Sequence, residues 1–283
     1  MAGLKLVMLS ALAMVAFAAN SLLCRMALVE TQIDPASFTL WRILSGAIIL
    51  SLIVMARKRN PFKAGSLKSG LALMVYAGGF SFAYISMTTG AGALLLFGAV
   101  QITMIGWGLY KGERMSKLQW LGFVLAIVGL VLLLLPSASV PEISSAALMV
   151  SAGIAWGIYS LLGKGTAMPI EATAGNFIRA LPFAILLFIL FLPHQETDYT
   201  GIAYAIASGA IASGLGYALW YSILPYIAAI KAATLQLSVP VIAVFAGWMF
   251  LQEAFTTRIV ISSALVLGGV GLVIWVKSTA HQP

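Results

Sequence analysis

Charged residues are too few in this chain to cover a water-soluble fold. Asp, Glu, Lys and Arg together make up 8% of the 283 residues, whereas a soluble domain carries about 25%. Between them lie ten apolar stretches of about 20 residues, each long enough to cross about 30 Å of hydrocarbon as a helix. In lipid, only a helix or a closed barrel satisfies every backbone hydrogen bond. The sequence therefore predicts an all-α integral membrane protein.

The predicted spans leave no room for a soluble domain. They cover residues 4–26, 35–55, 67–87, 91–110, 118–135, 143–162, 173–192, 201–222, 228–251 and 256–276. Ala16-Phe17-Ala18 resembles a signal-peptide cleavage site, but the apolar run continues beyond it and a second span follows, so we expect the first span to be retained. Cys24 is the single cysteine, which excludes an internal disulfide.

Basic residues near the span ends predict the orientation, because Lys and Arg concentrate on the cytoplasmic side. With residue 1 inside, the inside ends carry Lys5, Arg57, Lys58, Arg59, Lys63, Lys68, Lys111, Arg114, Lys117, Lys164, Lys231 and Lys277. The outside ends carry only Arg25 and Arg258. Both termini are therefore expected in the cytoplasm. The net charge of +8 follows from this bias and from anionic lipid, so nucleic-acid binding is not expected.

An internal repeat runs through the chain at an offset of 137 to 140 positions. SLLCR at residues 21–25 matches SLLGK at residues 160–164. Further pairs at nearly the same offset are Phe17 with Trp156, Arg42 with Arg179, Glu113 with Glu253, and Gly129 with Gly269. Each copy holds five spans, so the second copy enters the membrane from the opposite side. Residues 1–137 and 138–283 are thus predicted to be two inverted five-helix repeats, which in transporters surround a central substrate site.

The ends of the two copies carry a family resemblance. GERMS at residues 112–116, followed by Gly122 and Gly129, corresponds to QEAFT at residues 252–256, followed by Gly268 or Gly269 and Gly271. The chain resembles the paired EamA-type repeats of the drug/metabolite transporter superfamily, and within it the bacterial exporters of aromatic amino acids. The resemblance implies ten helices around a central cavity and efflux of small metabolites across the bacterial inner membrane.

The residue inventory opposes an enzyme, a metal site or an ATP-driven pump. His194 and His281 fall in a loop and in the tail, and none of the eight acids lies in the middle of a span. Gly163-Lys164 lacks both the upstream Gly and the following Ser or Thr of a phosphate-binding loop. We expect no catalytic residues, no cofactor and no metal.

Polar and aromatic residues on two repeat-related helix faces are the main binding candidates. The faces consist of Phe17, Asn20, Ser21 and Cys24 in the first span and Trp156, Tyr159, Ser160 and Gly163 in the sixth. Their i, i+3, i+4, i+7 spacing places each set on one side of its helix. Aromatic rings with amide and hydroxyl groups suit an apolar ligand that has a polar end. Helix packing through rings and small residues is the alternative interpretation.

Two further faces and two buried amides complete the predicted substrate site. The faces are Tyr76, Phe80 and Tyr84 in the third span and Ser213, Tyr217 and Tyr221 in the eighth, and the amides are Gln101 and Gln236. Some of these aromatics, Tyr84 foremost, also suit an interfacial belt. The amides also suit cross-links between helices.

Three residues are predicted to act in structure or gating. Arg42 and Arg179 lie too deep in their spans to be surface charges. We favour a role in which they donate hydrogen bonds to backbone carbonyls at helix ends, and the alternative is that they attract a carboxylate. Pro240 interrupts a helix and is a hinge candidate, with a static kink as the alternative. Glu113 and Glu253 are interpreted as capping residues or partners of Arg114 and Arg258.

These features together predict a secondary transporter that exports aromatic and other hydrophobic amino acids by alternating access. Proton coupling usually needs an ionisable group within the membrane, and arginine does not release its proton, so facilitated diffusion or exchange is expected. The expected partners are a small-molecule substrate and the lipid bilayer, and a monomer is compatible with the sequence. The alternatives are an organic-cation or multidrug exporter, which the absence of a central acid opposes, and a non-transporting scaffold.

The charge bias gives a topology prediction. Reporter fusions or cysteine labelling should place residues 57–68 in the cytoplasm and residues 193–199 outside, because the basic residues cluster in the first segment and not in the second. The reverse labelling pattern would overturn the orientation.

Overall fold

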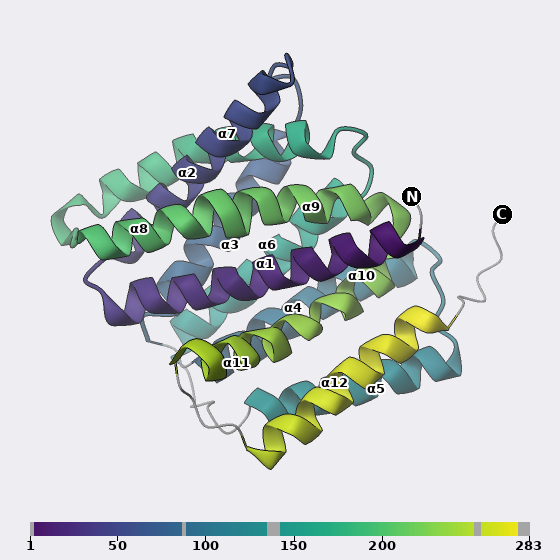
Figure 1. Cartoon of the computed structure of the whole chain (residues 1–283). Coiled ribbons are helices and arrows are strands. Elements are labelled where there is room, and N and C mark those ends of the chain that lie inside the picture. Colours follow the sequence, from purple (N-terminus) through teal and green to yellow (C-terminus); the bar gives the residue numbers. More distant parts are fainter. Residues whose placement is uncertain (1–2, 87–88, 135–141, 252–255, 277–283) are drawn as a thin grey trace.

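The computed structural model describes residues 3–86, 89–134, 142–251 and 256–276, and these residues form helices joined by short connections. The first half contains α1 (Gly3–Glu30), α2 (Pro35–Ala56), α3 (Leu67–Ala83), α4 (Thr89–Tyr110) and α5 (Lys117–Leu134). The second half contains α6 (Ile143–Gly163), α7 (Pro169–Leu190), η2 (Leu192–His194), α8 (Tyr199–Ala207), η3 (Ser208–Leu215), α9 (Gly216–Ile223), η4 (Leu224–Tyr226), α10 (Ala229–Gln236), α11 (Ser238–Leu251) and α12 (Thr257–Trp275). In Figure 1, α2 and α7 form one edge of the bundle, and α5 and α12 form the other.

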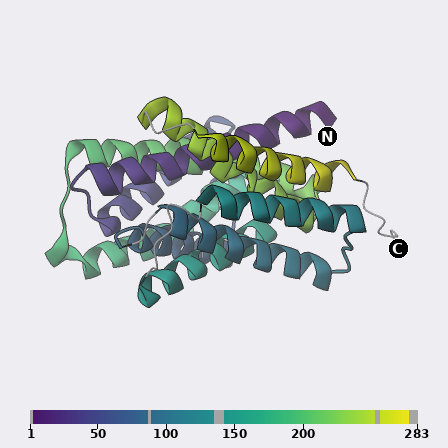
Figure 2. The same cartoon turned by 90° about the horizontal axis from the view of Figure 1, so that it is seen from below.

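The helices have the length and surface of a multi-pass membrane protein. Among the described residues, seven helical segments are long and apolar enough to cross a bilayer, and three shorter apolar helices lie at 67–83, 95–110 and 117–133. Large apolar side chains such as Leu4 and Ile102 point outward and are mostly exposed, as expected where lipid replaces water. The start of α1 and the end of α12 lie at the same end of the bundle (Figures 1 and 2).

Polar residues fix several of the helix starts. Asp34 accepts hydrogen bonds from the backbone N–H groups of Ala36 and Ser37, and Pro35 occupies the first turn of α2. Ser66, Asp198 and Thr256 cap α3, α8 and α12 in the same manner. Such side chains satisfy N–H groups that have no partner inside the helix. The short polar stretches between the apolar runs therefore define where the helices begin.

The eighth predicted span is not a regular α-helix. Residues 208–215 form a π-helical segment, η3, between α8 and α9, and Tyr199–Tyr226 together span 28 residues. Gly209 lies in this segment against α2, where an added Cβ would collide with the backbone of Arg42. Segments of π-helix occur frequently at functional sites, and the hydrophobic pattern carried no sign of this one.

The ninth predicted span divides into α10 and α11 at Leu237. Pro240 lies in the first turn of α11 and has no N–H to donate to the carbonyl of Gln236 four residues earlier. The structure therefore shows the interruption that the sequence predicted at Pro240. Its role as a hinge stays a prediction.

Glycine allows α5 and α12 to pack backbone against backbone. A Cβ added at Gly122 would lie 2.8 Å from the carbonyl oxygen of Gly269, and one added at Gly129 would lie 2.8 Å from that of Ser262. As the residue number rises in α5, the number of its contact in α12 falls, so the two helices are antiparallel. Close approach through small residues is a main source of helix association in lipid.

Gly269 and its neighbour Gly268 provide a matched test of this packing. A Cβ at Gly269 would lie 2.7 Å from the backbone nitrogen of Ala126, whereas one at Gly268 would meet nothing within 4 Å. Gly269→Ala should destabilise the protein by about 1–3 kcal/mol through overpacking, and Gly268→Ala should leave stability unchanged or raise it slightly. Melting temperatures of the detergent-solubilised variants measure this difference. Equal melting temperatures would contradict the close contact between α5 and α12.

Candidate functional site

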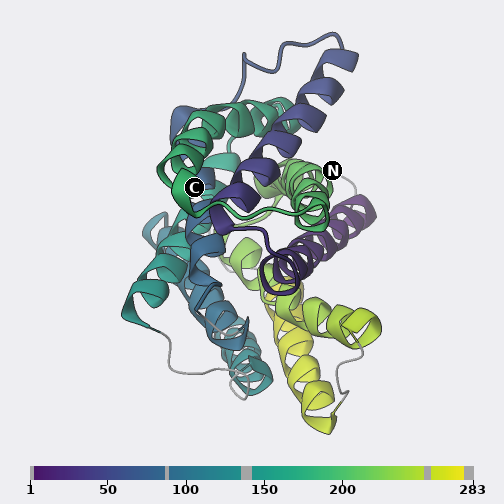
Figure 3. The same cartoon turned by 90° about the vertical axis from the view of Figure 1, so that its left-hand side faces the viewer.

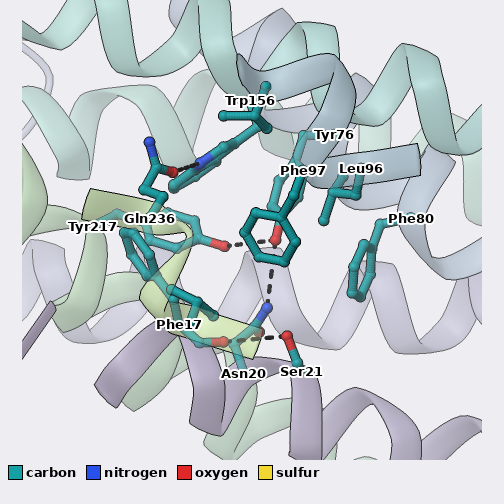
Figure 4. Close-up of a pocket in the computed structure, with 12 residues that line it drawn as sticks. Phe17, Asn20, Ser21, Tyr76, Phe80, Leu96, Phe97, Trp156, Tyr217 and Gln236 are labelled. Atoms are coloured by element: carbon teal, nitrogen blue, oxygen red, sulfur yellow. Dashed lines mark hydrogen bonds between the residues drawn. The ribbon is translucent and has the colours of Figure 1, made fainter. Parts of the chain in front are cut away.

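An internal pocket lies where helices from both halves of the chain converge (Figure 4). Its lining consists of Phe17, Asn20 and Ser21 of α1, Tyr76 and Phe80 of α3, Leu96, Phe97 and Val100 of α4, Trp156 of α6, Tyr217 of α9, Gln236 of α10 and Val239 of α11. The residues that the sequence predicted for the site and that line this pocket are Phe17, Asn20, Tyr76, Phe80, Trp156, Tyr217 and Gln236. Their role in binding stays a prediction.

Aromatic rings from four helices meet in the pocket wall. The ring of Trp156 lies 5.2 Å from Phe17, 4.9 Å from Tyr76 and 4.7 Å from Tyr217, measured between centroids. The Phe17 and Trp156 rings meet edge to face at 89°, which is a favourable arrangement for aromatic pairs. The structure therefore brings together the repeat-related aromatic residues of α1 and α6.

Asn20 is the centre of a buried polar network beside these rings. Its Oδ1 accepts hydrogen bonds from Ser208 Oγ at 2.7 Å and Ser213 Oγ at 3.2 Å. Its Nδ2 donates to the hydroxyl oxygen of Tyr76 at 3.4 Å. The Tyr217 hydroxyl also donates to the Tyr76 hydroxyl oxygen, at 3.4 Å. Every polar atom of the Asn20 side chain is thus engaged, and the bonds join α1 to α3 and to η3.

The π-helical turns explain how two serines reach one oxygen. Ser208 and Ser213 are five residues apart, which places them about 140° apart around an α-helix at 3.6 residues per turn. In a π-helix the backbone bond itself runs from i to i+5, so residues at this spacing lie on one side. Ser208 was not predicted as a site residue, because residues at i and i+5 do not share a face of an α-helix.

Trp156 and Gln236 hold each other across the pocket. The indole Nε1–H of Trp156 donates to Gln236 Oε1 at 2.6 Å, and Gln236 Nε2 donates to the carbonyl of Ala232 at 3.3 Å. This bond links α6 to the last turn of α10, directly before the interruption at Leu237. The amide predicted at position 236 is therefore both a pocket residue and a link between helices.

Four predicted substrate residues lie outside the pocket lining. Tyr159 and Tyr221 are buried beside each other, with the Tyr221 hydroxyl donating to the Tyr159 carbonyl at 2.8 Å. Tyr84 packs its ring 4.7 Å from Phe80 at the end of α3. Gln101 Nε2 donates to the carbonyl of Ala233 at 2.8 Å and so cross-links α4 to α10. A binding role for these residues stays a prediction.

The two repeat-related arginines have different environments. Arg179 donates to the backbone carbonyls of Ala64 at 2.8 Å and Phe62 at 3.1 Å, in the connection between α2 and α3 that lies at the top of Figure 3. Arg42 instead donates from Nε to Ser213 Oγ at 3.0 Å and from Nη2 to the Tyr217 hydroxyl at 2.7 Å. Arg179 anchors a loop, whereas Arg42 lies against the pocket wall.

The pocket is too small for an amino acid in this conformation. Its volume is about 30 Å³, whereas sites for small ligands typically occupy about 300–1,000 Å³. Leu96, Phe97 and Val100 of α4 also line the pocket. They were not predicted, because apolar residues in an apolar helix carry no signal that marks them as site residues. A molecule of the size of an amino acid would fit this pocket only after the helices around it had separated.

Among the described residues, no group of three His, Cys, Asp or Glu residues is placed to hold a metal ion. His281 and Glu253 lie outside the described residues.

Glu113 joins three segments at one end of the bundle. Its carboxylate accepts hydrogen bonds from the N–H groups of Ala229 at 2.8 Å and Ile230 at 2.9 Å, and from Lys164 Nζ at 3.1 Å. Glu113 therefore caps α10, which is one of its two predicted roles, and it also pairs with Lys164. Partial burial raises the pKa of Glu113, but the two N–H groups and Lys164 outweigh it, so the pKa lies below the usual value. A carboxylate held ionised in this way is poorly suited to carry protons.

The lowered pKa of Glu113 gives a pH prediction. Its carboxylate stabilises the fold above the ordinary value of 4.5, and this contribution is lost as the pH falls below that value. Glu113→Gln should therefore melt at a lower temperature than the wild type at pH 7, and the difference should shrink at pH 4. Glu142→Gln is the control, because the Glu142 side chain makes no capping bond to α6. A Glu113→Gln deficit that is the same at both pH values would contradict the ionised cap.

Known proteins resemble this chain along most of its length. A protein of Pseudomonas aeruginosa called uncharacterized is 50% identical over 268 residues, covering 94% of this chain and 93% of that protein. The uncharacterized transporter YoaV of Bacillus subtilis is 24% identical over 84% of this chain and 87% of its own length. A probable amino-acid metabolite efflux pump of Salmonella typhimurium is 24% identical over 77% of this chain and 79% of its own length.

A solved structure and a family model agree with these similarities. A crystal structure superposes with a TM-score of 0.78 at 15% identity, covering 95% of this chain and 97% of the other, which supports the fold alone. Residues 4–135 and 143–275 each match the EamA-like transporter family. The chain is a multi-pass membrane protein that belongs to the EamA-like transporter family.

Proposed function

We propose that this protein exports aromatic and other hydrophobic amino acids across the bacterial inner membrane by alternating access. The observation that carries the proposal is the pocket itself, in which aromatic rings and amide groups from both family-matched segments face one another. Rings provide apolar contact area for an aromatic side chain, and amide and hydroxyl groups provide hydrogen bonds for its polar end. The Salmonella relative named as a probable amino-acid metabolite efflux pump supports efflux of amino-acid metabolites, the broader class to which these substrates belong.

We also propose that the two matched segments are inverted repeats of five spans each, divided near residue 137. In chain order, α1 corresponds to α6, α2 to α7, α3 to the span that contains α8, η3 and α9, α4 to α10 and α11, and α5 to α12. The helix contacts support this arrangement, because a contact between two helices recurs between their two counterparts. The contact of α3 with α6 corresponds to that of α9 with α1, and the contact of α4 with α6 corresponds to that of α11 with α1. The counterparts α5 and α12 pack on each other, as do α2 and α7. Ten spans place both termini on one side, which we assign to the cytoplasm from the positive charges.

Alternating access in such a protein moves one repeat or helix bundle against the other around the central site. The small volume of the pocket fits a conformation in which the helices have closed upon the site. The interruption at Pro240 lies beside the pocket residue Gln236, so bending there changes the pocket directly. We therefore keep Pro240 as the proposed hinge. Arg179 keeps the α2–α3 connection in place while the helices move.

Facilitated diffusion or exchange is the proposed energetic mode. A proton carrier in the membrane is usually a buried carboxylate or histidine. In the described part of the chain, the acids within spanning helices lie at helix ends. Glu171 is in the first turn of α7, where it pairs with Arg59 at 2.8 Å, and Glu30 is in the last turn of α1. Glu113 is held ionised by its partners. The substrate's own concentration gradient is therefore the proposed driving force.

Counterflow in proteoliposomes tests the function. Vesicles preloaded with unlabelled phenylalanine or tryptophan should take up the labelled amino acid, and the rate should survive collapse of the proton gradient. Trp156→Ala should reduce uptake about tenfold, since removing a buried ring forfeits about 1–3 kcal/mol of contact. Trp120→Ala is the matched control, because Trp120 of α5 is 44% exposed on the outer surface.

Other outcomes would identify the alternatives. Uptake that requires an imposed pH difference would show proton coupling. Uptake of quaternary ammonium compounds in place of amino acids would show an organic-cation exporter. Lack of flux and of ligand-dependent stabilisation across amino acids, quaternary ammonium compounds and nucleotide sugars would favour a scaffold.

A further inference from the structure

The wall of the pocket covers a buried positive charge. Arg42 of α2 is 1% exposed, and its guanidinium carbon lies 5.2 Å from the centre of the Tyr76 ring. Its Nε and Nη2 donate to the hydroxyls of Ser213 and Tyr217. Tyr76 and Tyr217 both line the pocket, so two residues that contact the guanidinium also form the pocket wall.

This charge lacks a counter-ion within the described part of the chain. The ion pairs among the described residues join Arg59 to Glu171 and Lys164 to Glu113, and none includes Arg42. The side chains that contact the guanidinium are the hydroxyls of Ser213 and Tyr217 and the ring of Tyr76, and none of them is an acidic group. Arg42 therefore imposes an uncompensated positive field on the neighbouring pocket.

One nitrogen of the guanidinium also lacks a hydrogen-bond acceptor. Nη1 of Arg42 is buried and has no partner, although buried donors are almost always satisfied. Leaving a buried charge both unpaired and incompletely hydrogen-bonded is strongly unfavourable. An interior of this kind becomes more stable when an anion enters beside it.

The repeat-related Arg179 shows that the arrangement at Arg42 is not required by the fold. Arg179 lies at the equivalent place in the second copy, yet its Nη atoms donate to the carbonyls of Ala64, Gly175 and Phe62. Those acceptors satisfy the cation within the protein. At Arg42, the neutral hydroxyls of Ser213 and Tyr217 occupy this position, and Tyr217 also lines the pocket. A ligand carboxylate is a stronger acceptor than either hydroxyl.

We propose that Arg42 recognises the carboxylate of the transported molecule, so that the site selects aromatic carboxylates and disfavours organic cations. This inference rests on the proposed function and narrows its substrate class. When the pocket enlarges to admit an aromatic ring, displacement of the Tyr76 or Tyr217 hydroxyl brings the carboxylate within reach of Nη1 and Nη2. The rings of Phe17 and Trp156 then contact the apolar part of the same ligand.

Binding to the detergent-solubilised protein tests the inference without transport. The probes are phenylalanine, 3-phenylpropionate, which lacks the ammonium group, and phenethylamine, which lacks the carboxylate. The two carboxylates should raise the melting temperature of the wild type at concentrations at least about tenfold below that of phenethylamine, because a charged hydrogen bond is lost with the amine. Equal potency of phenethylamine and 3-phenylpropionate, or no stabilisation by either carboxylate, would overturn the proposal.

Variants separate recognition from a purely structural role. Arg42→Gln should weaken stabilisation by 3-phenylpropionate about tenfold or more and leave that by phenethylamine unchanged or stronger, whereas Arg42→Lys should retain the preference for the acid. Arg179→Gln is the matched control and should retain the acid-to-amine ratio even if its melting temperature falls. If Arg42→Gln folds and retains the wild-type ratio, Arg42 is not the recognition residue.

The same assay remains decisive if Arg42→Gln does not fold. In that case the wild-type comparison of acid and amine decides, together with Arg42→Lys. The proposed function fails separately: carboxylates that stabilise the protein but are not transported would refute amino-acid export and leave the anion site intact. Stabilisation by 3-phenylpropionate but not by phenylalanine would support the carboxylate site and exclude amino acids as the substrates.

Discussion

The interior of this protein depends on one requirement, which is that polar groups placed in hydrocarbon must find partners within the protein. Asn20 meets it by bonding Ser208, Ser213 and Tyr76, which come from two other segments of the chain. The π-helical form of η3 follows from the same requirement, because it turns both serines toward one oxygen. The hydrogen bonds of Asn20 thus hold α1, α3 and η3 together around the pocket.

Apolar contact has a different role here from its role in a water-soluble protein. Lipid chains are as apolar as leucine, so helices gain little by hiding leucine from lipid and associate instead through close packing and hydrogen bonds. The glycines of α5 and α12 provide close packing at one edge of the bundle. At the centre, aromatic rings pack on one another and side-chain hydrogen bonds join the helices. Close backbone packing thus holds this edge, whereas side chains hold the centre.

Much of the fold was predictable because hydrophobic length and helix-capping residues are local signals. Asp34, Ser66 and Asp198 begin helices where the apolar runs begin, and Pro240 interrupts its helix as its missing N–H requires. The repeat and the i, i+4 spacing placed Phe17 and Trp156 on faces that meet. The conformation of η3 was not predictable, because a π-helix depends on the tertiary partners of Ser208 and Ser213.

Side-chain partners were the less predictable part of the site. Glu113 has Arg114 beside it in sequence, yet it pairs with Lys164, 51 positions away, and caps a helix more than 100 positions away. Gln101 and Gln236 look alike as buried amides, but only Gln236 faces the pocket. Which partner each side chain contacts depends on how its helix is rotated about its own axis within the bundle. An apolar helix surrounded by lipid and other apolar helices gives little sequence signal for its rotation.

The contrast between Arg42 and Arg179 indicates how a duplicated scaffold acquires a one-sided site. A repeat supplies the same residue twice, but a small polar molecule with one charged end needs only one complementary group. For Arg179 of the second copy, the connection between α2 and α3 provides two carbonyls, those of Ala64 and Phe62, and α7 itself provides that of Gly175, so this charge is satisfied away from the pocket. In the first copy, Ser213 and Tyr217 hold the side chain of Arg42 beside the pocket without neutralising it. The helix packing can therefore stay similar in the two halves while the pocket carries a positive charge on one side only.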